Sequence, residues 1–277
     1  MKQVLVTGAN GQLGKSIKRI SPNFKGLKFV FTDVADLDIT NSEEVNTFFE
    51  SNALDYCINC AAYTAVDKAE QEVHKAFLIN ATAVKNLAEA CQKTGAVLIH
   101  ISTDFVFDGT KRIPYTEEDM PIPLNVYGKS KLKGEQFVQE ILDRHFIVRT
   151  SWLYSEYGNN FVKTILRLAE TRDEISVVNN QIGSPTYAGD LASFLLERIN
   201  KPSKDYGIYH YSNDGSISWY DFAVEIFKQH KKAARVVPIP TSAYPTAAKR
   251  PEYSVMDLSK VKTIFGSTIP LWHQRVI

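Results

Sequence analysis

Tyr127 and Lys131 are the two residues whose types and spacing point most directly to proton chemistry. They stand four positions apart in the segment NVYGKSKLKGEQ, so a helix there would place both side chains on one face. A tyrosine phenol has a pKa of about 10, which is too high for acid–base work at neutral pH. A lysine cation close to the ring favours tyrosinate and lowers that pKa. The pair would then exchange a proton with a carbinol oxygen, and the competing interpretation is a solvated helix face.

Ser102, Thr103 and Asp104 stand at the end of an apolar segment, 97–102, that is expected to form a strand. In open parallel sheets, ligands bind at the edge where the strands end. A hydroxyl group at that edge can hydrogen-bond a substrate carbonyl or alcohol. The alternative is a hydroxyl that only caps the strand exit, and the two interpretations have equal weight for these residues alone.

Glycines at positions 8, 11 and 14 follow the first apolar segment in VLVTGANGQLGKSI. Gly8 allows a tight turn, Gly11 lets the backbone approach a pyrophosphate, and Gly14 lets the following helix pack close to the strand. The free N–H groups at the helix start favour an anion. The pattern predicts a dinucleotide-binding loop, and an oxidised nicotinamide bound there would reinforce the effect of Lys131 on the pKa of Tyr127.

Asp33 ends the next apolar segment, at about the position where a carboxylate meets the hydroxyls of the adenosine ribose. A carboxylate there favours NADH, because it repels a 2′-phosphate. Asp38 and Ile39 form a second candidate contact, with adenine. The alternative for these aspartates is a helix cap or a turn, and that alternative is strongest for Asp36.

Ala61, Ala62 and Tyr63 follow the third apolar segment, 55–59. Two small residues at a strand end leave room for a ligand beneath the backbone, and Tyr63 is a candidate to cover the cofactor. The alternative is a tight strand exit that binds nothing.

The elements that must position these residues alternate between strand and helix. Strands are expected over 2–6, 28–31, 55–59, 97–102 and 146–150, and helices over 12–20, 41–52, 74–94 and 127–142. This alternation predicts a doubly wound α/β fold of the Rossmann type, with a parallel sheet between two layers of helices. Residues 1–150 are expected to form the dinucleotide-binding domain. Residues 151–277 are expected to form a smaller substrate-binding region, with parts of 150–200 returning to the first domain.

Composition narrows the possible functions. The 277 residues include 44% hydrophobic and 23% charged residues, and the net charge is +1. That balance gives no broad attraction for nucleic acid or for anionic membranes, so neither partner is expected. Cys57 and Cys60 fall on opposite sides of a predicted strand, which argues against a shared metal or a disulfide. No stretch reaches the roughly 20 apolar residues that span a bilayer, and a cytoplasmic location is expected.

The chain resembles the extended short-chain dehydrogenase/reductases, and within them the enzymes that reduce keto sugars linked to dTDP. The resemblance covers nearly the whole chain, and its later motifs are more specific than the glycine loop. The matching segments are TGANGQLG, AAYTAVDKAE, STDFVFDG, YGKSKLKGE, RTSWLYSEYGNNFVKT, QIGSPTYAGDLA, YHYSNDGSISWYDFA and RPEYSVMDLSK.

The resemblance implies hydride transfer from NADPH or NADH to C4 of dTDP-4-dehydro-L-rhamnose, which gives dTDP-L-rhamnose. Tyr127 is then the proton donor, Lys131 holds the nicotinamide ribose, and Thr103 orients the keto sugar. Cofactor contacts are implied at Gly8, Asn10, Gly11, Gln12, Leu13, Asp38, Ile39, Ala61, Ala62 and Tyr63.

Substrate contacts are implied at Asp104, Phe105 and Trp152. Trp152 would lie against an apolar face of the sugar, unless it is an ordinary core indole. Arg250 would pair with the diphosphate, since a guanidinium suits that geometry; the alternative is a surface arginine.

The chain departs from the family pattern at Lys15. Some members have an acidic residue just after the glycine loop, where it joins a magnesium site between subunits. A lysine there predicts no such metal site, and it leaves a homodimer as only one possible state.

Two other functions remain open at this point. Relatives of these reductases serve as a regulatory subunit of methionine adenosyltransferase, but the presence of Thr103, Tyr127 and Lys131 favours catalysis. The other candidate is a related nucleotide-sugar epimerase or dehydratase. Dehydratases of the family usually have a second acid after the aspartate, whereas Phe105 stands there in this chain.

Overall fold

Six parallel strands form the central sheet of the computed structural model, which describes residues 1–276. The strands run in the order β10-β5-β4-β3-β1-β2, and all of their pairings are parallel. They are β1 (Lys2–Thr7), β2 (Leu27–Phe31), β3 (Tyr56–Asn59), β4 (Val97–Thr103), β5 (His145–Thr150) and β10 (Gly207–His210). From β1 the chain adds β2 on one side and then returns to add β3 on the other side. Ligands bind in open α/β sheets at such a switch in strand order, here between β1 and β3. The predicted doubly wound α/β fold is confirmed.

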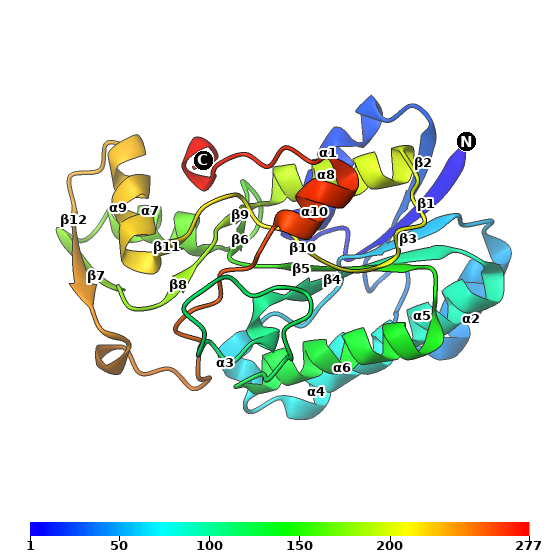
Figure 1. The fold of residues 1–277 in the computed structure, drawn as a ribbon, viewed down its shortest axis with the longest axis horizontal. Coiled ribbons are helices and arrows are strands. Elements are labelled where there is room, and N and C mark those ends of the chain that lie inside the picture. The colour runs from blue at the N-terminus through cyan, green and yellow to red at the C-terminus, as the bar shows by residue number, and fades with distance from the viewer. Residues whose placement is uncertain (277) are drawn as a thin grey trace.

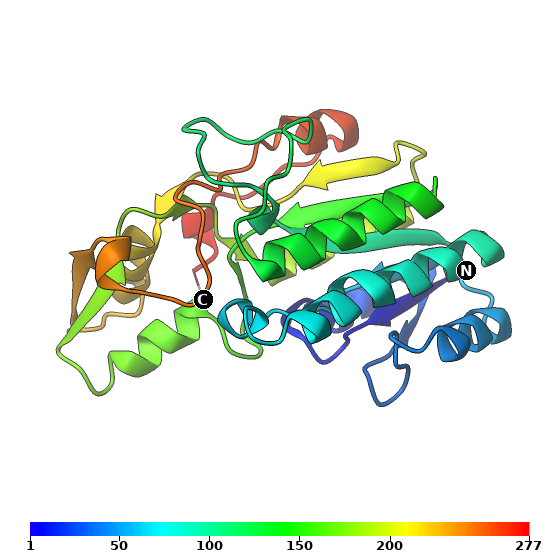
Figure 2. The same ribbon diagram turned by 90° about the horizontal axis from the view of Figure 1, so that it is seen from below.

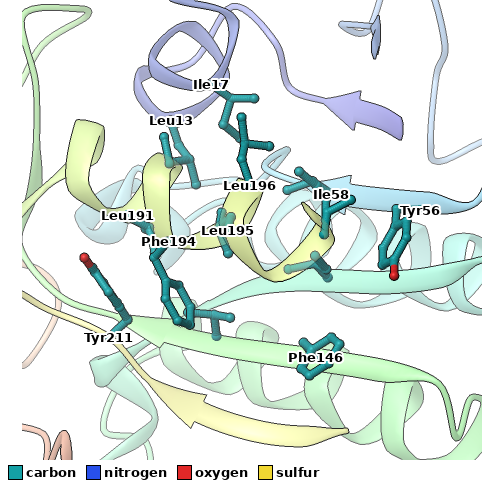
Figure 3. Packing of buried hydrophobic residues seen from close by; sticks show 14 of the residues in the cluster. Leu13, Ile17, Tyr56, Ile58, Phe146, Leu191, Phe194, Leu195, Leu196 and Tyr211 are labelled. Atoms are coloured by element: carbon teal, nitrogen blue, oxygen red, sulfur yellow. The ribbon is translucent and has the colours of Figure 1, made fainter. Parts of the chain in front are cut away.

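Helices cover both faces of this sheet (Figure 1). One face carries α2 (Ser42–Ser51), α5 (Ala83–Thr94) and α6 (Val126–Ile141), and the other carries α1 (Gln12–Ile20), α8 (Ala188–Asn200) and α10 (Ser259–Phe265). Figure 3 shows Ile17 of α1 and Leu195 of α8 packed over Ile58 of β3. All three side chains are buried. Each contributes about 1.5–3 kcal/mol of burial free energy, so apolar packing fixes the helices on the sheet.

A smaller group of helices and short strands lies beyond the carboxyl ends of the sheet strands (Figure 2). Its members are β6 (Leu153–Tyr154), α7 (Phe161–Leu168), β7 (Glu174–Val178), β8 (Ile182–Gly183), β9 (Thr186–Tyr187), β11 (Ile217–Ser218), α9 (Trp219–Gln229) and β12 (Arg235–Ile239). They pair as β6 with β9, β7 with β12 and β8 with β11. Phe222 and Ile226 of α9 are fully buried in a separate apolar cluster, which holds this group together.

Short helical segments complete the described chain. They are η1 (Ser21–Asn23), α3 (Val66–Ala69), α4 (Val73–Phe77), η2 (Leu78–Thr82), η3 (Asp104–Val106), η4 (Thr241–Ala243) and η5 (Trp272–Gln274). None of the helices within residues 1–276 has the length and apolar character that crossing a membrane requires.

The helix predicted over 74–94 is divided by a π-helical turn at η2. Asn80 in this turn accepts a hydrogen bond from the backbone N–H of Tyr63 and donates one to the carbonyl of the same residue. Gly134 of α6 packs so closely that a Cβ there would lie 2.2 Å from the Asn80 carbonyl oxygen. The π-helical turn therefore lets Asn80 bond to Tyr63, just after β3, and lets α6 pack closely at Gly134. The periodicity of apolar residues reveals neither contact.

Residues beyond 150 contribute both to the sheet layer and to the smaller group. Helices α8 and α10 cover the sheet, and β10 forms its outer strand beside β5. The expected return of chain from 150–200 corresponds to α8, whereas β10 and α10 come from later positions. The division into a dinucleotide-binding domain over 1–150 and a substrate-binding region over 151–277 stays a prediction.

Candidate active site

A cavity of about 550 Å³ lies at the carboxyl edge of the sheet. Its wall brings together Thr103 at the end of β4, Tyr127 and Lys131 of α6, and two tryptophans from beyond residue 150, Trp152 and Trp219. These residues are far apart in the sequence, and the fold gathers them because parallel strands all end at this edge. We call this space the main cavity.

A second cavity of about 330 Å³ continues the main one, since Gly11, Cys60 and Ala62 line both. Its wall also contains the residues expected near adenosine, Asp33, Asp38 and Ile39, together with Gly8 and Ala61. The remaining residues of the glycine loop line the main cavity: Asn10, Gln12, Leu13 and Gly14. Two joined spaces on either side of a glycine loop fit an elongated ligand with two halves.

The glycine loop has the geometry that a phosphate-binding turn requires. Gly8 has a φ of +61°, and a Cβ there would lie 2.6 Å from the backbone nitrogen of Ala61. A Cβ on Gly14 would lie 2.5 Å from the Gly8 carbonyl oxygen, so α1 can approach β1 only with a glycine here. Gly11 caps α1 without a side-chain hydrogen bond, which leaves the first N–H groups of the helix free for an anion.

Asp33 lies at the exit of β2, across from the glycine loop. Its Oδ2 accepts a hydrogen bond from the backbone N–H of Asn10 at 2.9 Å, and its Oδ1 accepts one from Val34. Asp38 accepts bonds from the backbone and the hydroxyl group of Thr40. Both carboxylates are held in place and line the second cavity, as a contact with ribose or adenine requires.

Two predicted contacts lie away from the cavity walls. Tyr63 is buried, and its hydroxyl donates to Glu72 at 3.0 Å. Arg250 forms a two-point ion pair with Asp67, at 2.7 and 3.1 Å. The structure therefore does not bring the Tyr63 ring to the cofactor cavity or the Arg250 guanidinium to the main cavity. Arg250 has its partner 183 positions away, which no local sequence pattern reveals, whereas Tyr63 binds Glu72, only nine residues further along the chain.

Tyr127 stands in the first turn of α6, which Asn125 caps by accepting a bond from the N–H of Gly128. A Cβ on Gly128 would lie 2.2 Å from the Phe105 carbonyl oxygen, so a glycine lets α6 press against η3. The Tyr127 ring meets the Phe105 ring edge-on, with centroids 5.8 Å apart.

The pKa of Tyr127 moves in the direction opposite to the one expected from Lys131. Burial raises this pKa to about 12, and the adjacent Thr103 hydroxyl only partly opposes the rise. The cause is desolvation: removing a phenolate from water costs more free energy than hydrogen bonding to its neighbours restores. The phenol is consequently protonated at neutral pH, which is the state that a proton donor needs.

Lys131 is buried beneath the main cavity, with 2% of its surface exposed. Its Nζ donates to the Ile101 carbonyl at 2.6 Å and lies 3.4 Å from Nε2 of His100. Asn59 holds the other ring nitrogen of His100 and accepts a bond from Thr7, so polar contacts run from α6 across three strands. Burial lowers the pKa of Lys131 to about 8.

Thr103 and Asp104 lie side by side where β4 ends. The Thr103 hydroxyl accepts from the backbone N–H of Phe105 at 3.2 Å and donates to Oδ1 of Asp104 at 3.1 Å. Asp104 and Phe105 both line the main cavity, as expected of substrate contacts. Ser102 instead donates its hydroxyl to the buried Glu135, so it serves the core.

Trp152 and Trp219 form a stacked aromatic wall of the main cavity, with ring centroids 3.5 Å apart and planes at 10°. Trp152 has a φ of +46°, a strained value for a large side chain. Gly183 leaves room for it, because a Cβ there would lie 2.6 Å from the indole. Sequence reasoning identified Trp152 but missed Trp219, whose role depends on packing between distant segments.

Comparisons with known proteins agree with this geometry. The family model described as "RmlD substrate binding domain" matches residues 1–277. The chain is 44% identical to the dTDP-4-dehydrorhamnose reductase of Aggregatibacter actinomycetemcomitans, covering 99% of this chain and 97% of that one.

Solved structures show the same kinship. A dTDP-4-dehydrorhamnose reductase from Clostridium acetobutylicum is 46% identical, with a TM-score of 0.94 over 98% of this chain and 96% of that one. The enzyme from Bacillus anthracis in complex with NADP is 44% identical, with a TM-score of 0.94 over 99% and 97%. The resemblance noted in the sequence is confirmed, and the chain belongs to the family of dTDP-4-dehydrorhamnose reductases.

Proposed function

We propose that this protein reduces the C4 keto group of dTDP-4-dehydro-L-rhamnose with NADPH or NADH and releases dTDP-L-rhamnose. The observation that carries the proposal is the meeting of Thr103, Tyr127 and Lys131 in one cavity that continues into the glycine loop. An acid, a cation and a hydroxyl group beside a dinucleotide site suit carbonyl reduction. Family membership supports the choice of sugar.

The residues present fit a nicotinamide dinucleotide. Gly8 and Gly11 form a cradle that a Cβ would narrow, and the free start of α1 suits the pyrophosphate. Asp33 would bind the adenosine ribose hydroxyls, with Asp38 and Ile39 nearer to adenine. When bound, the dinucleotide supplies the hydride. The Bacillus anthracis relative was solved in complex with NADP, which supports NADPH as one of the two cofactors.

Tyr127 supplies the proton. As C4 is reduced, its oxygen gains negative charge, and the protonated phenol donates a proton to that atom. Lys131, buried below, stabilises the resulting phenolate and binds the nicotinamide ribose hydroxyls. Thr103 donates a hydrogen bond to the same oxygen and fixes the sugar orientation.

The aromatic wall gives the sugar an apolar surface. Trp152 and Trp219 line the same cavity as the polar groups of β4 and α6. An aromatic face suits the C–H face of a deoxy sugar. In this arrangement one side of the ring faces the hydride source and the other faces the indoles.

The test is consumption of NADPH or NADH by the purified protein with a panel of dTDP-linked 4-keto-6-deoxy sugars. We expect the nicotinamide absorbance to fall with dTDP-4-dehydro-L-rhamnose and the product to be dTDP-L-rhamnose by NMR. An epimerase would convert the sugar without net consumption of the dinucleotide, and a regulatory subunit would do neither. Either result would overturn the proposal.

A further inference from the structure

Asp104 is a buried carboxyl group at the reacting end of the main cavity. It lines the cavity, yet only 2% of its surface is exposed. Its Oδ2 has no hydrogen-bond partner within residues 1–276. An unpaired buried carboxylate is costly, which favours the neutral acid. Burial accordingly raises the pKa of Asp104 to about 7; the Thr103 hydroxyl and that of Ser254, which lies nearby without forming a hydrogen bond to Oδ2, oppose the rise only in part.

The hydrogen bonds of Thr103 make this protonation state important. A threonine hydroxyl has one proton to donate and two lone pairs that accept. Phe105 N–H already occupies one lone pair, and Oδ1 of Asp104 takes the proton. In that arrangement Thr103 has no proton left for another acceptor.

A keto oxygen offers only lone pairs, so Thr103 can bind it only by donating. If Asp104 is protonated, its own O–H can donate to the second lone pair of Thr103. The Phe105 bond stays in place, and the Thr103 proton becomes free to point into the cavity. Thr103 then accepts two hydrogen bonds and keeps its own proton for the substrate, and no atom has to move far.

We propose that Asp104 is a positioning residue whose protonation sets the direction of the Thr103 hydroxyl, so that Thr103 donates to the C4 carbonyl oxygen only while Asp104 is neutral. The inference rests on the proposed reduction of a keto sugar. Asp104 consumes no proton in the reaction, because the proton on the product alcohol comes from Tyr127. Its part is to keep the hydrogen-bond donor that orients the carbonyl.

The other ionisable groups near this end of the cavity are Tyr127 and Lys131 on α6, and the thiol of Cys60, which follows β3 and whose pKa burial raises well above its ordinary value. Tyr127 has a pKa of about 12 and stays protonated throughout the useful range. Lys131, with a pKa of about 8, loses its charge in that range and must be told apart from Asp104. Arg250 stands on the segment that holds Ser254, but its charge is paired with Asp67.

The experiment compares kcat/KM for dTDP-4-dehydro-L-rhamnose, as a function of pH, between wild-type protein and Asp104→Asn. An asparagine amide can donate N–H to Thr103, as the neutral acid does, but it does not titrate. Above a pH of about 7 the wild-type value should fall by nearly tenfold per pH unit as Asp104 ionises. The ratio of variant to wild type should rise by the same factor. A constant ratio would show that the fall belongs to Lys131 and would overturn the proposal.

The Thr103→Val background tests whether Asp104 acts through Thr103. Without the hydroxyl, Asp104→Asn should no longer change the pH profile of the residual activity. A change that persists would mean direct action on the sugar, contrary to the proposal.

A third measurement does not depend on turnover. The infrared spectrum of the wild-type protein at a pH of about 6 should contain a carboxylic acid carbonyl band that Asp104→Asn removes. Its absence would overturn the inference even if the enzyme is active. Conversely, a band without any turnover of the sugar would count against the proposed function and leave the protonation of Asp104 established.

Discussion

Tyr127 illustrates how burial and charge compete at a single residue. The spacing with Lys131 predicts a lowered pKa, yet the desolvated phenol has a pKa of about 12. Lys131 is also desolvated, and burial lowers its pKa to about 8. A reductase benefits from this balance, because the donor must start protonated. The cationic lysine matters at the moment when the phenolate forms.

Tyr127→Phe tests the proton donor. The substitution removes one hydroxyl group and keeps the ring that packs edge-on against Phe105. We expect kcat to fall by roughly 10²–10⁴, the usual contribution of general acid catalysis. Fluorescence titration should give an NADPH dissociation constant close to that of wild type. Turnover near the wild-type rate would rule out Tyr127 as the donor.

Asp33→Ala tests the ribose contact. Removing a carboxylate that lines the second cavity should relieve repulsion of a 2′-phosphate. At this half-buried site the repulsion is worth about 1 kcal/mol, so kcat/KM with NADPH relative to NADH should rise by roughly fivefold. Asp36→Ala is the control, since Asp36 stands in the same turn but outside that cavity wall. An equal ratio in both variants would remove the role assigned to Asp33.

At the scale of the elements, the sequence predicts those parts of the site that follow from local pattern. Tyr127 and Lys131 share a helix face, and Thr103 ends a strand. The pattern of strands and helices therefore places all three at the carboxyl edge of the predicted parallel sheet. Trp219 has no such pattern, because it reaches Trp152 only through the packing of α9 beyond the sheet. The unpaired oxygen of Asp104 is equally invisible, since it depends on what surrounds that side chain from every direction.

Gly183→Ala tests the support of the aromatic wall. A Cβ at this position in β8 would lie 2.6 Å from the Trp152 indole and force the stack apart. The loss of an aromatic contact worth about 0.5–1.5 kcal/mol should raise KM for the sugar by roughly twofold to tenfold. Affinity for NADPH should stay the same.

Gly26→Ala is the matched control for that experiment. Its nearest neighbour would be the Asn200 side chain at 3.9 Å, an ordinary contact. We expect steady-state kinetics like those of wild type. If Gly183→Ala also leaves KM unaltered, the sugar does not use this wall.

Glu135→Gln tests the junction of α6 with β5. Glu135 and Arg149 form a fully buried ion pair, 2.7 Å apart, with side chains 0% and 2% exposed. Removing one charge leaves the other buried and unpaired, which should lower the free energy of unfolding by about 3–5 kcal/mol. Urea denaturation measures this change.

Glu174→Gln is the comparison, because Glu174 pairs with Arg235 at the surface, where the side chains are 50% and 74% exposed. That loss should be within about 1 kcal/mol. Similar losses in the two variants would show that the buried pair has no special part in stability.

At the scale of the whole molecule, one polar chain joins the early and late parts of the sequence beneath the sheet edge. Arg149 of β5 binds Glu135 of α6, and its other end lies 3.4 Å from Nε2 of His210 in β10. Nδ1 of His210 donates to the Tyr115 carbonyl, in the loop after β4. Strand β10 is thus attached to β5 by backbone pairing and by His210, whose neutral ring accepts a hydrogen bond from the Arg149 guanidinium.

His210 makes the stability of the protein depend on pH. Burial, reinforced by the Arg149 cation, lowers the pKa of His210 to about 3, whereas an unfolded chain has a histidine pKa of about 6.5. Between these values the unfolded state binds one more proton than the folded state. Acidification from about pH 6.5 should therefore cost up to about 1.4 kcal/mol of unfolding free energy per pH unit from this residue.

His210→Gln should reduce that slope, and urea denaturation between roughly pH 4 and 7 measures it. Asp104 contributes with the opposite sign, because its raised pKa makes the folded state bind the extra proton over much of this range. The comparison of variant with wild type cancels that contribution, since Asp104 is present in both. His230→Gln, at an exposed position of the chain, is the control for the loss of an imidazole. A slope as steep in His210→Gln as in wild type would mean that other buried groups, such as His100, govern the response to acid.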